Sequence, residues 1–197
     1  MIEPETDLEL LARWRTGDNM AASALIKRHF AMLERFFGTK AHGHEEDLIQ
    51  CTFVACVESR DAFRGDSTFR THLYKLARMQ LFAHYRKQYR TRALDFTTTS
   101  VCDLGTSPSG ALLRREESEL LARALQQVPV DQQIALELTC WEGLSAPEIA
   151  EVLGIPENTV YSRLSRARTR LREVLEQLSG AADERQRALS LLTGSDD

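Results

Sequence analysis

Arginine side chains recur along one short stretch in the C-terminal half of the chain. Positions 155–172 hold five arginines and a single acidic residue, Glu157. Guanidinium groups can pair with phosphates and can donate paired hydrogen bonds to a guanine edge. The stretch therefore predicts contact with a nucleic acid. The alternative from the residues alone is a helical hairpin whose arginines are only solvated, since arginine is a good helix former.

Two helices joined by a tight turn are expected to position these arginines. Ser145 can cap the first helix, with Glu148 completing a capping box, and Gly154 can end it in the left-handed conformation. Pro156 then starts a second helix. Its predicted buried stripe is Val160, Leu164, Ala167, Leu171, Val174 or Leu175, and Leu178. The opposite side carries Tyr161, Ser162, Arg163, Ser165, Arg166 and Arg168. This pattern predicts a helix-turn-helix, whose second helix enters the major groove.

A second basic stretch lies earlier in the chain. Positions 60–92 hold nine basic and two acidic residues, and a helix expected over 68–88 mixes aromatic rings with cations. Cations can follow the phosphates of single-stranded nucleic acid, and rings can stack on its bases. The alternative is that the rings are core residues of a small helical domain. The residues concerned are Phe69, Tyr74, Lys75, Arg78, Phe82 and Arg86.

Composition excludes several functions. The 197 residues carry a net charge of −4, which argues against a protein that coats nucleic acid with its whole surface. The four cysteines form no CxxC pair and no zinc spacing with histidine, and Cys51 and Cys56 are expected in the core. We find no nucleophile–base pattern, so we expect no catalytic residue, metal or cofactor. The acidic N-terminus lacks an apolar run, so we expect a cytoplasmic protein without membrane insertion.

All periodic segments are helical, so we expect an all-α fold of two small domains joined by a flexible linker. The Thr-, Ser- and Gly-rich stretch from Leu94 marks the boundary, and Asp131 is expected to cap a later helix. The predicted domains are residues 1–93, a linker over 94–111, a helix-turn-helix domain over 112–178, and a tail over 179–197. The predicted helices cover 7–16, 21–37, 44–60, 68–88, 112–128, 132–141, 145–153, 156–178 and 181–192.

Four stretches in this order resemble the extracytoplasmic-function (ECF) group of bacterial sigma factors. EEDLIQCTF is similar to the family's EDLVQETF, and FRGDSTFRTHLYKLAR is similar to its FRGDSSFRTWLYRIAR. WEGLSAPEIAEVLGIP, preceded by ALQQVPVDQQIALEL, is similar to EGLSYEEIAEILGVP preceded by LPPRQREALLL. TVYSRLSRARTRLRE is similar to TVKSRLHRARERLRE. The resemblance runs from near Asp7 to near Leu178.

The resemblance implies a sigma2-like and a sigma4-like domain in a dissociable subunit that binds core RNA polymerase and selects promoters. It assigns contact with the polymerase clamp helices to Asp47, Leu48, Gln50 and Phe53. It assigns contact with the melted non-template strand of the minus-ten element to Lys75, Arg78, Met79, Ala83 and Arg86. It assigns contact with the duplex minus-thirty-five element to Tyr161, Ser162, Ser165 and Arg166, with Arg163 and Arg168 placed for phosphates. An anti-sigma partner, common in the family, is a further candidate.

The chain departs from the family pattern at both predicted DNA surfaces. His72 stands where the family usually has Trp, and Met79 stands where it has Asn. Tyr161 and Ser165 replace a common Lys or Arg and a common His or Phe. These departures predict promoter elements that differ from the usual ones. Two other functions are consistent with the helical pattern: a stand-alone dimeric DNA-binding regulator, and a helical protein that docks on other factors.

Overall fold

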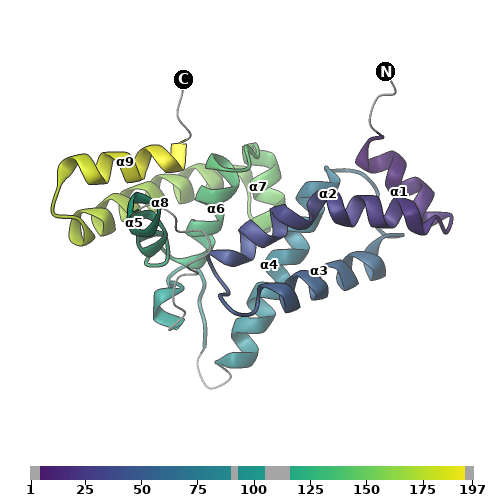
Figure 1. The fold of residues 1–197 in the computed structure, drawn as a ribbon, viewed down its shortest axis with the longest axis horizontal. Coiled ribbons are helices and arrows are strands. Elements are labelled where there is room, and N and C mark those ends of the chain that lie inside the picture. Colours follow the sequence, from purple (N-terminus) through teal and green to yellow (C-terminus); the bar gives the residue numbers. More distant parts are fainter. Residues whose placement is uncertain (1–4, 90–92, 105–115, 194–197) are drawn as a thin grey trace.

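The fold is helical throughout the part of the chain that the structure describes, as the sequence predicts. The structure, a computed structural model, describes residues 5–89, 93–104 and 116–193 (Figure 1). The elements are α1 (Asp7–Arg15), α2 (Asn19–Gly38), α3 (Glu45–Ser59), α4 (Phe69–Gln88), the 3-10 turn η1 (Cys102–Leu104), α5 (Glu116–Leu125), α6 (Val130–Cys140), α7 (Ala146–Leu153), α8 (Glu157–Leu178) and α9 (Ala182–Thr193). Each predicted helix is present within a few residues of its expected bounds, and residues 112–115 of the fifth lie outside the described residues.

Local side-chain caps start several helices where the sequence places them. Thr6 and Glu9 form a capping box at α1, and the Asp18 carboxylate accepts from two amides at the start of α2. The Thr68 hydroxyl accepts from the Thr71 amide at 3.1 Å and so caps α4. Each cap satisfies amides that would otherwise lack a partner in the first turn of its helix.

The predicted helix-turn-helix is confirmed as α7 and α8. The Glu148 carboxylate accepts from the Ser145 amide at 2.9 Å, and this contact belongs to the predicted capping box. Gly154 ends α7 with φ of 66°, a conformation that costs glycine little because it has no Cβ. The whole predicted stripe of α8 up to Leu175 is buried.

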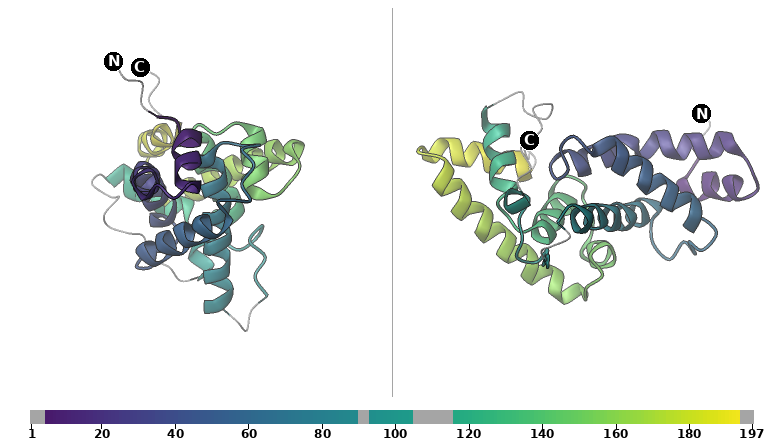
Figure 2. Two further views of the ribbon diagram at one scale, coloured as in Figure 1. Left: turned by 90° about the vertical axis from the view of Figure 1, so that its right-hand side faces the viewer. Right: turned by 90° about the horizontal axis from the view of Figure 1, so that it is seen from below.

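The helices form two lobes that lie side by side along the long axis of the molecule (Figure 2). Helices α1 to α4 make one lobe, and α5 to α9 make the other. One contiguous cluster of buried apolar residues runs through both lobes, and α4 packs directly against α7 of the other lobe. The two predicted domains are therefore in close contact in this structure.

The first part of the predicted linker is a packed segment rather than a free one. Phe96 is buried and stacks on Phe82 of α4, with ring centroids 3.9 Å apart. Its carbonyl accepts from the Asp131 amide at 3.1 Å, and the Cys102 amide donates to the Gln126 carbonyl at 2.8 Å. Phe96 thus lies between the two lobes, and residues 99–102 pack on the second lobe. Residues 105–111 of the predicted linker lie outside the described part of the chain.

Two smaller expectations are wrong. Cys51 was expected in the core beside Cys56, but it is exposed on α3 while Cys56 is buried. Asp131 was expected to cap a helix, but it lies in the first turn of α6, which begins at Val130. Its carboxylate instead contacts arginines of two other helices, described below.

Candidate polymerase and nucleic-acid interfaces

The outer face of α8 carries the residues expected to contact duplex DNA. Tyr161, Ser162, Ser165 and Arg166 are all exposed, and Tyr161 has 60% of its surface accessible. The spacing i, i+1, i+4 and i+5 places them on one side of the helix. The Arg166 guanidinium donates to the Ser162 carbonyl at 3.2 Å, which holds the cation against its own helix. This face projects from a helix whose opposite side is buried, as a recognition helix requires.

The two arginines expected to contact phosphates differ in their surroundings. Arg168 is exposed. The Arg163 side chain is only 12% exposed, and its Nη1 lies 2.9 Å from Oδ2 of Asp131. Arg163 is therefore held within the protein in this structure, whereas Arg168 faces solvent.

Most of the α4 cations that are predicted to contact single-stranded DNA are exposed. Lys75, Met79, Ala83 and Arg86 are exposed. Their spacing of four, four and three residues places them along one side of the helix. Arg78 is the exception, because its Nη2 and Nε lie 2.9 and 3.1 Å from Oδ1 of Asp131. Its guanidinium also lies over the Phe82 ring, 4.4 Å from the centroid.

The aromatic rings of α4 are buried in the core. Of the two roles considered for them, core packing is therefore correct and stacking on bases is not supported. Phe69, Tyr74 and Phe82 are each at most 5% exposed. Tyr74 packs at 5.6 Å from the Phe36 ring, and Phe82 stacks on Phe96. These rings cannot stack on bases in this structure. The face of α4 thus offers cations, Met79 and Ala83, but none of these three rings for stacking.

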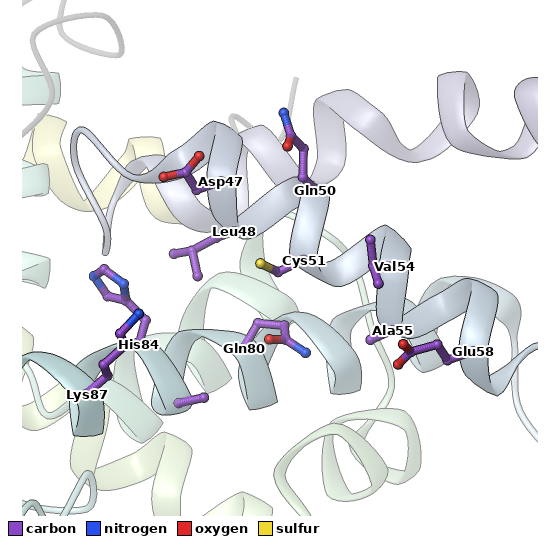
Figure 3. Close-up of a pocket in the computed structure, with 11 residues that line it drawn as sticks. Asp47, Leu48, Gln50, Cys51, Val54, Ala55, Glu58, Gln80, His84 and Lys87 are labelled. Atoms are coloured by element: carbon purple, nitrogen blue, oxygen red, sulfur yellow. The ribbon is translucent and has the colours of Figure 1, made fainter.

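A groove separates α3 from α4 and holds residues of both predicted interfaces. Its volume is about 640 Å³. Figure 3 shows Leu48 and Cys51 of α3 facing Gln80 and His84 of α4, while Gln50 points away. Burial lowers the pKa of His84, and the neighbouring His44 lowers it further. The lining residues are Asp47, Leu48, Gln50, Cys51, Val54, Ala55, Glu58, Gln80, Ala83, His84 and Lys87.

The residues of α3 expected to contact the polymerase are not equally accessible. Asp47 and Gln50 are exposed. Leu48 is 5% exposed and belongs to the core, and Phe53 is half-buried. Exposed apolar side chains at Val54 and Val57 extend this surface toward the end of α3. Sequence reasoning missed Cys51 and Val54, although their exposure on the same helix could have been inferred from the period of three and four residues.

A second pocket, of about 330 Å³, was not anticipated from the sequence. It lies between the loop after α3, the start of α4, and Glu151 of α7. Burial lowers the pKa of His72, and Lys75 lowers it further. The only signal for this site was the basic character of residues 60–92. It is lined by Ser59, Ala62, Phe63, Arg64, Asp66, Ser67, His72, Lys75 and Glu151.

Metal-binding clusters and membrane-spanning helices are both absent from residues 5–89, 93–104 and 116–193. No three His, Cys, Asp or Glu side chains gather there in a way that could hold a metal ion. Among the described helices, none is long and apolar enough to span a membrane.

Each of the two lobes matches the profile of a known protein family. Residues 25–91 match the family profile of Sigma-70 region 2, and residues 118–171 match that of Sigma-70, region 4. The two regions occur in the order and place that the four resembling stretches predict. They define a transcription initiation factor of the sigma-70 class.

Curated relatives narrow the class further. The ECF RNA polymerase sigma-E factor of Escherichia coli K12 is 30% identical over 181 residues, which cover 85% of this chain and 93% of that protein. The RNA polymerase sigma-H factor of Pseudomonas aeruginosa is 30% identical over 189 residues, covering 90% and 98%. The chain belongs to the ECF group of sigma factors. It is a sigma subunit, which binds core RNA polymerase and directs transcription initiation at promoter DNA. The alternative of a stand-alone dimeric regulator is not favoured.

Solved structures show the same fold. CnrH, solved with the cytosolic domain of CnrY, has a TM-score of 0.64 and 28% identity, over 89% of this chain and all of that one. The sigma factor RpoE of Bartonella quintana, solved with the anti-sigma factor NepR, has a TM-score of 0.61 and 24% identity, over 81% and 97%.

Proposed function

We propose that the exposed face of α8 contacts the minus-thirty-five element as duplex DNA. Tyr161, Ser162, Ser165 and Arg166 would contact base edges in the major groove, and Arg163 and Arg168 would contact phosphates. The supporting observation is that the four base-contacting candidates share one exposed face while the other side of α8 is buried. An arginine can hydrogen-bond to guanine, and a tyrosine ring can contact a thymine methyl group.

The face of α4 is proposed to hold the non-template strand of the melted minus-ten element. Lys75 and Arg86 are exposed cations that can pair with phosphates, and Met79 and Ala83 lie between them. Arg78 would join them once it is released from Asp131. Because the rings of α4 are buried, this surface would hold the strand through charge and apolar contact rather than through stacking on Tyr74 or Phe82.

The surface of α3 is proposed to contact the clamp helices of the polymerase. Asp47 and Gln50 would make the polar contacts, and Phe53 is partly accessible beside them. Leu48 would act indirectly, since its side chain is buried and can only position α3. The groove between α3 and α4 brings this surface next to Ala83, so polymerase and melted strand would meet at one edge of the lobe.

The remaining assignments follow from this division. Residues 1–93 would form the polymerase and minus-ten domain, 94–111 the connection, 112–178 the minus-thirty-five domain, and 179–197 a tail. The chain would supply no catalytic group, because the polymerase performs the chemistry, and it would act in the cytoplasm, where the polymerase is. An anti-sigma factor is a proposed partner, since one structural relative was solved with such a protein.

Run-off transcription with purified core polymerase tests the proposal. The template is the DNA upstream of the chain's own coding sequence, together with a pool of other upstream regions. We expect a transcript from a defined start only when the protein is present. Asp47→Ala should weaken binding to core polymerase roughly 10- to 100-fold, since removing a charged contact costs about 1.5–3 kcal/mol, and both co-elution and the transcript should fall accordingly.

Glu46→Ala is the matched control for this variant. Glu46 is also exposed in the first turn of α3, but it does not line the groove. It should leave transcription and co-elution unchanged. Equal loss in the two variants would instead indicate a general effect of charge at the start of α3. Co-elution without a transcript on any template would contradict the promoter assignments and leave polymerase binding intact.

A further inference from the structure

Among the described residues, the ion pairs and the hydrogen bonds between side chains that join the two lobes all have their donors on the same lobe. In each, the donor comes from the first lobe and the acceptor is a carboxylate of α6 or α7 or of the residues between them. The contacts are Arg35–Glu142 at 3.0 Å, Arg78–Asp131 at 2.9 Å, Thr71–Glu148 at 3.2 Å, Ser67–Glu151 at 3.0 Å, Thr39–Glu137 at 3.0 Å, and Lys40–Glu137. The second lobe therefore presents negative groups to the basic lobe, as the phosphates of a nucleic acid would.

Asp131 joins the two predicted DNA surfaces through a single carboxylate. Oδ1 accepts from Arg78 of α4, and Oδ2 lies 2.9 Å from Arg163 of α8. The Asp131 side chain is 6% exposed, so this charge is held away from solvent between two cations. While both contacts are made, neither arginine is available for a DNA phosphate.

The contacts named above form the seam between the two lobes. One of them is a buried ion pair between Lys40 and Glu137. Lys40 is fully buried, and its ammonium donates to the Phe36 carbonyl at 2.8 Å, to the Thr39 hydroxyl at 3.0 Å, and to Glu137. The Glu137 carboxylate also accepts from Thr39 at 3.0 Å and from Gln133 at 2.8 Å. Every donor of the ammonium is therefore satisfied in the closed arrangement. If the lobes separated, Lys40 and Glu137 would be hydrated rather than left buried and unpaired.

The closed arrangement cannot serve both promoter elements at once. The elements lie ~25 base pairs apart by their names, which is ~85 Å of duplex at ~3.4 Å per base pair. In the structure Arg78 and Arg163 both lie within 3.1 Å of the same carboxylate group. The two lobes must therefore move apart before α4 and α8 can contact their elements together.

We propose that the second lobe masks the first in the free protein, with the carboxylates of the seam occupying cations of the first lobe until polymerase and promoter DNA replace them. This proposal rests on the proposed roles of α4 and α8. The mask is selective, because Asp131 of the second lobe withholds Arg78 of the first, while Lys75 and the outer face of α8 stay exposed. The contact between the lobes combines apolar packing with these charge pairs, and the charge pairs can be exchanged for phosphates, whereas a purely apolar contact could not be.

A charge-reversal cycle at the exposed edge of the seam tests the mask. Arg35 and Glu142 form the pair, and neither belongs to a predicted DNA or polymerase surface. Small-angle X-ray scattering on the full chain measures whether the lobes are together. The wild type should scatter as the closed form, and Arg35→Glu and Glu142→Arg should each increase the radius of gyration. Each single reversal should raise the ratio of open to closed molecules ~10-fold, the factor that ~1.4 kcal/mol produces.

The double variant and a control complete the cycle. Arg35→Glu combined with Glu142→Arg restores opposite charges and should return the chain to the closed form. Glu176→Arg, an equal charge change at an exposed site on α8 away from the seam, should stay closed. Identical scattering from all variants, or a wild type that is already open, would overturn the proposal that the second lobe masks the first.

Salt provides a second measurement that needs no variant. The Debye length falls from ~8 Å at physiological ionic strength to ~3 Å at ~1 M, which weakens the exposed Arg35–Glu142 pair, so the open fraction of the wild type should rise as salt is added. An open fraction that stays unchanged across the whole series would contradict a contribution of this pair to closure, even if a single reversal failed to fold. Because scattering involves neither polymerase nor promoter, its result is independent of the run-off experiment.

Discussion

Helices α4 and α8 both combine arginine with aromatic residues but present them differently. On α8 the ring of Tyr161 is exposed beside Arg166, and the buried side is aliphatic. On α4 the rings of Tyr74 and Phe82 are buried, and Arg78 is turned toward the other lobe. Composition alone therefore does not define a nucleic-acid surface. Whether a basic and aromatic helix can contact nucleic acid depends on which of its sides the neighbouring elements cover.

The largest expected effect is a loss of stability on removing the buried ring of Phe82, which extends from α4 and stacks on Phe96. Phe82→Ala should lower the free energy of unfolding by about 3–5 kcal/mol, since it removes a buried ring and leaves a cavity. Tyr161→Ala, which removes an exposed ring, should change that free energy by less than about 0.5 kcal/mol. Urea unfolding followed by circular dichroism measures both. If Phe82→Ala left stability unchanged while strand binding fell, Phe82 would be a stacking residue and the comparison of the two helices would be wrong.

A smaller effect is expected where α8 contacts duplex DNA. Arg166→Ala should weaken binding of the holoenzyme to its promoter by about 1–3 kcal/mol, and discrimination at one position of the minus-thirty-five element should be relaxed. The measurement is a binding titration against single-base variants of the promoter. Arg172→Ala, which changes an exposed arginine farther along α8, serves as the control and should retain that discrimination. An unchanged ranking of the promoter variants by Arg166→Ala would count against its contact with a base.

Arg86 distinguishes the step at which α4 acts. Arg86→Ala should slow formation of the melted complex by about 1 kcal/mol, the low end for a single nucleic-acid contact, with little change in initial duplex binding. Permanganate reactivity of unpaired thymines reports melting, and a gel-shift assay on ice reports the earlier complex. Lys27→Ala on α2 is the control, because Lys27 is an exposed cation outside α4. Equal losses in both assays would contradict a role confined to the single strand.

The smallest expected effect is a difference in acid sensitivity between the lobes. All five histidines lie in residues 1–93, and burial lowers the pKa of His29, His72 and His84. The unfolded chain therefore binds more protons than the native one, so stability should fall as the pH drops through the unfolded value of about 6.5. Hydrogen exchange at about pH 7.5 and about pH 5.5, on either side of that value and corrected for intrinsic rates, should show weaker protection of α2 and α4 but not of α8. Equal weakening in α8 would show that the histidines are not the cause.

The sequence predicts features that depend on neighbouring residues. The capping box of Ser145 and Glu148, the left-handed Gly154 and the buried stripe of α8 are all confirmed, because caps and helical periods are local. The order of the two sigma regions was likewise predicted, from motifs that span most of the chain.

Features that depend on contacts between distant residues could not be predicted. Asp131 and Arg78 are 53 positions apart, and nothing in either local sequence indicates that they pair. The choice between core and surface for Phe82 depended on Phe96, which lies in a stretch without periodicity. The residue-level roles at α3, α4 and α8 remain predictions, to be decided by the experiments above.

The packed segment over residues 95–104 also sets the length of the tether between the two lobes. Between Gln88 at the end of α4 and Glu116 at the start of α5 lie ~27 residues, a contour length of ~90 Å when fully extended. If the packed segment stays on the second lobe, only residues 89–94 are left to span the gap, and they reach ~20 Å. The same chain is thus a short tether or a long one, depending on whether residues 95–104 stay packed on the second lobe or leave it. The tolerance of the protein for different spacings between promoter elements should follow from that single unpacking step.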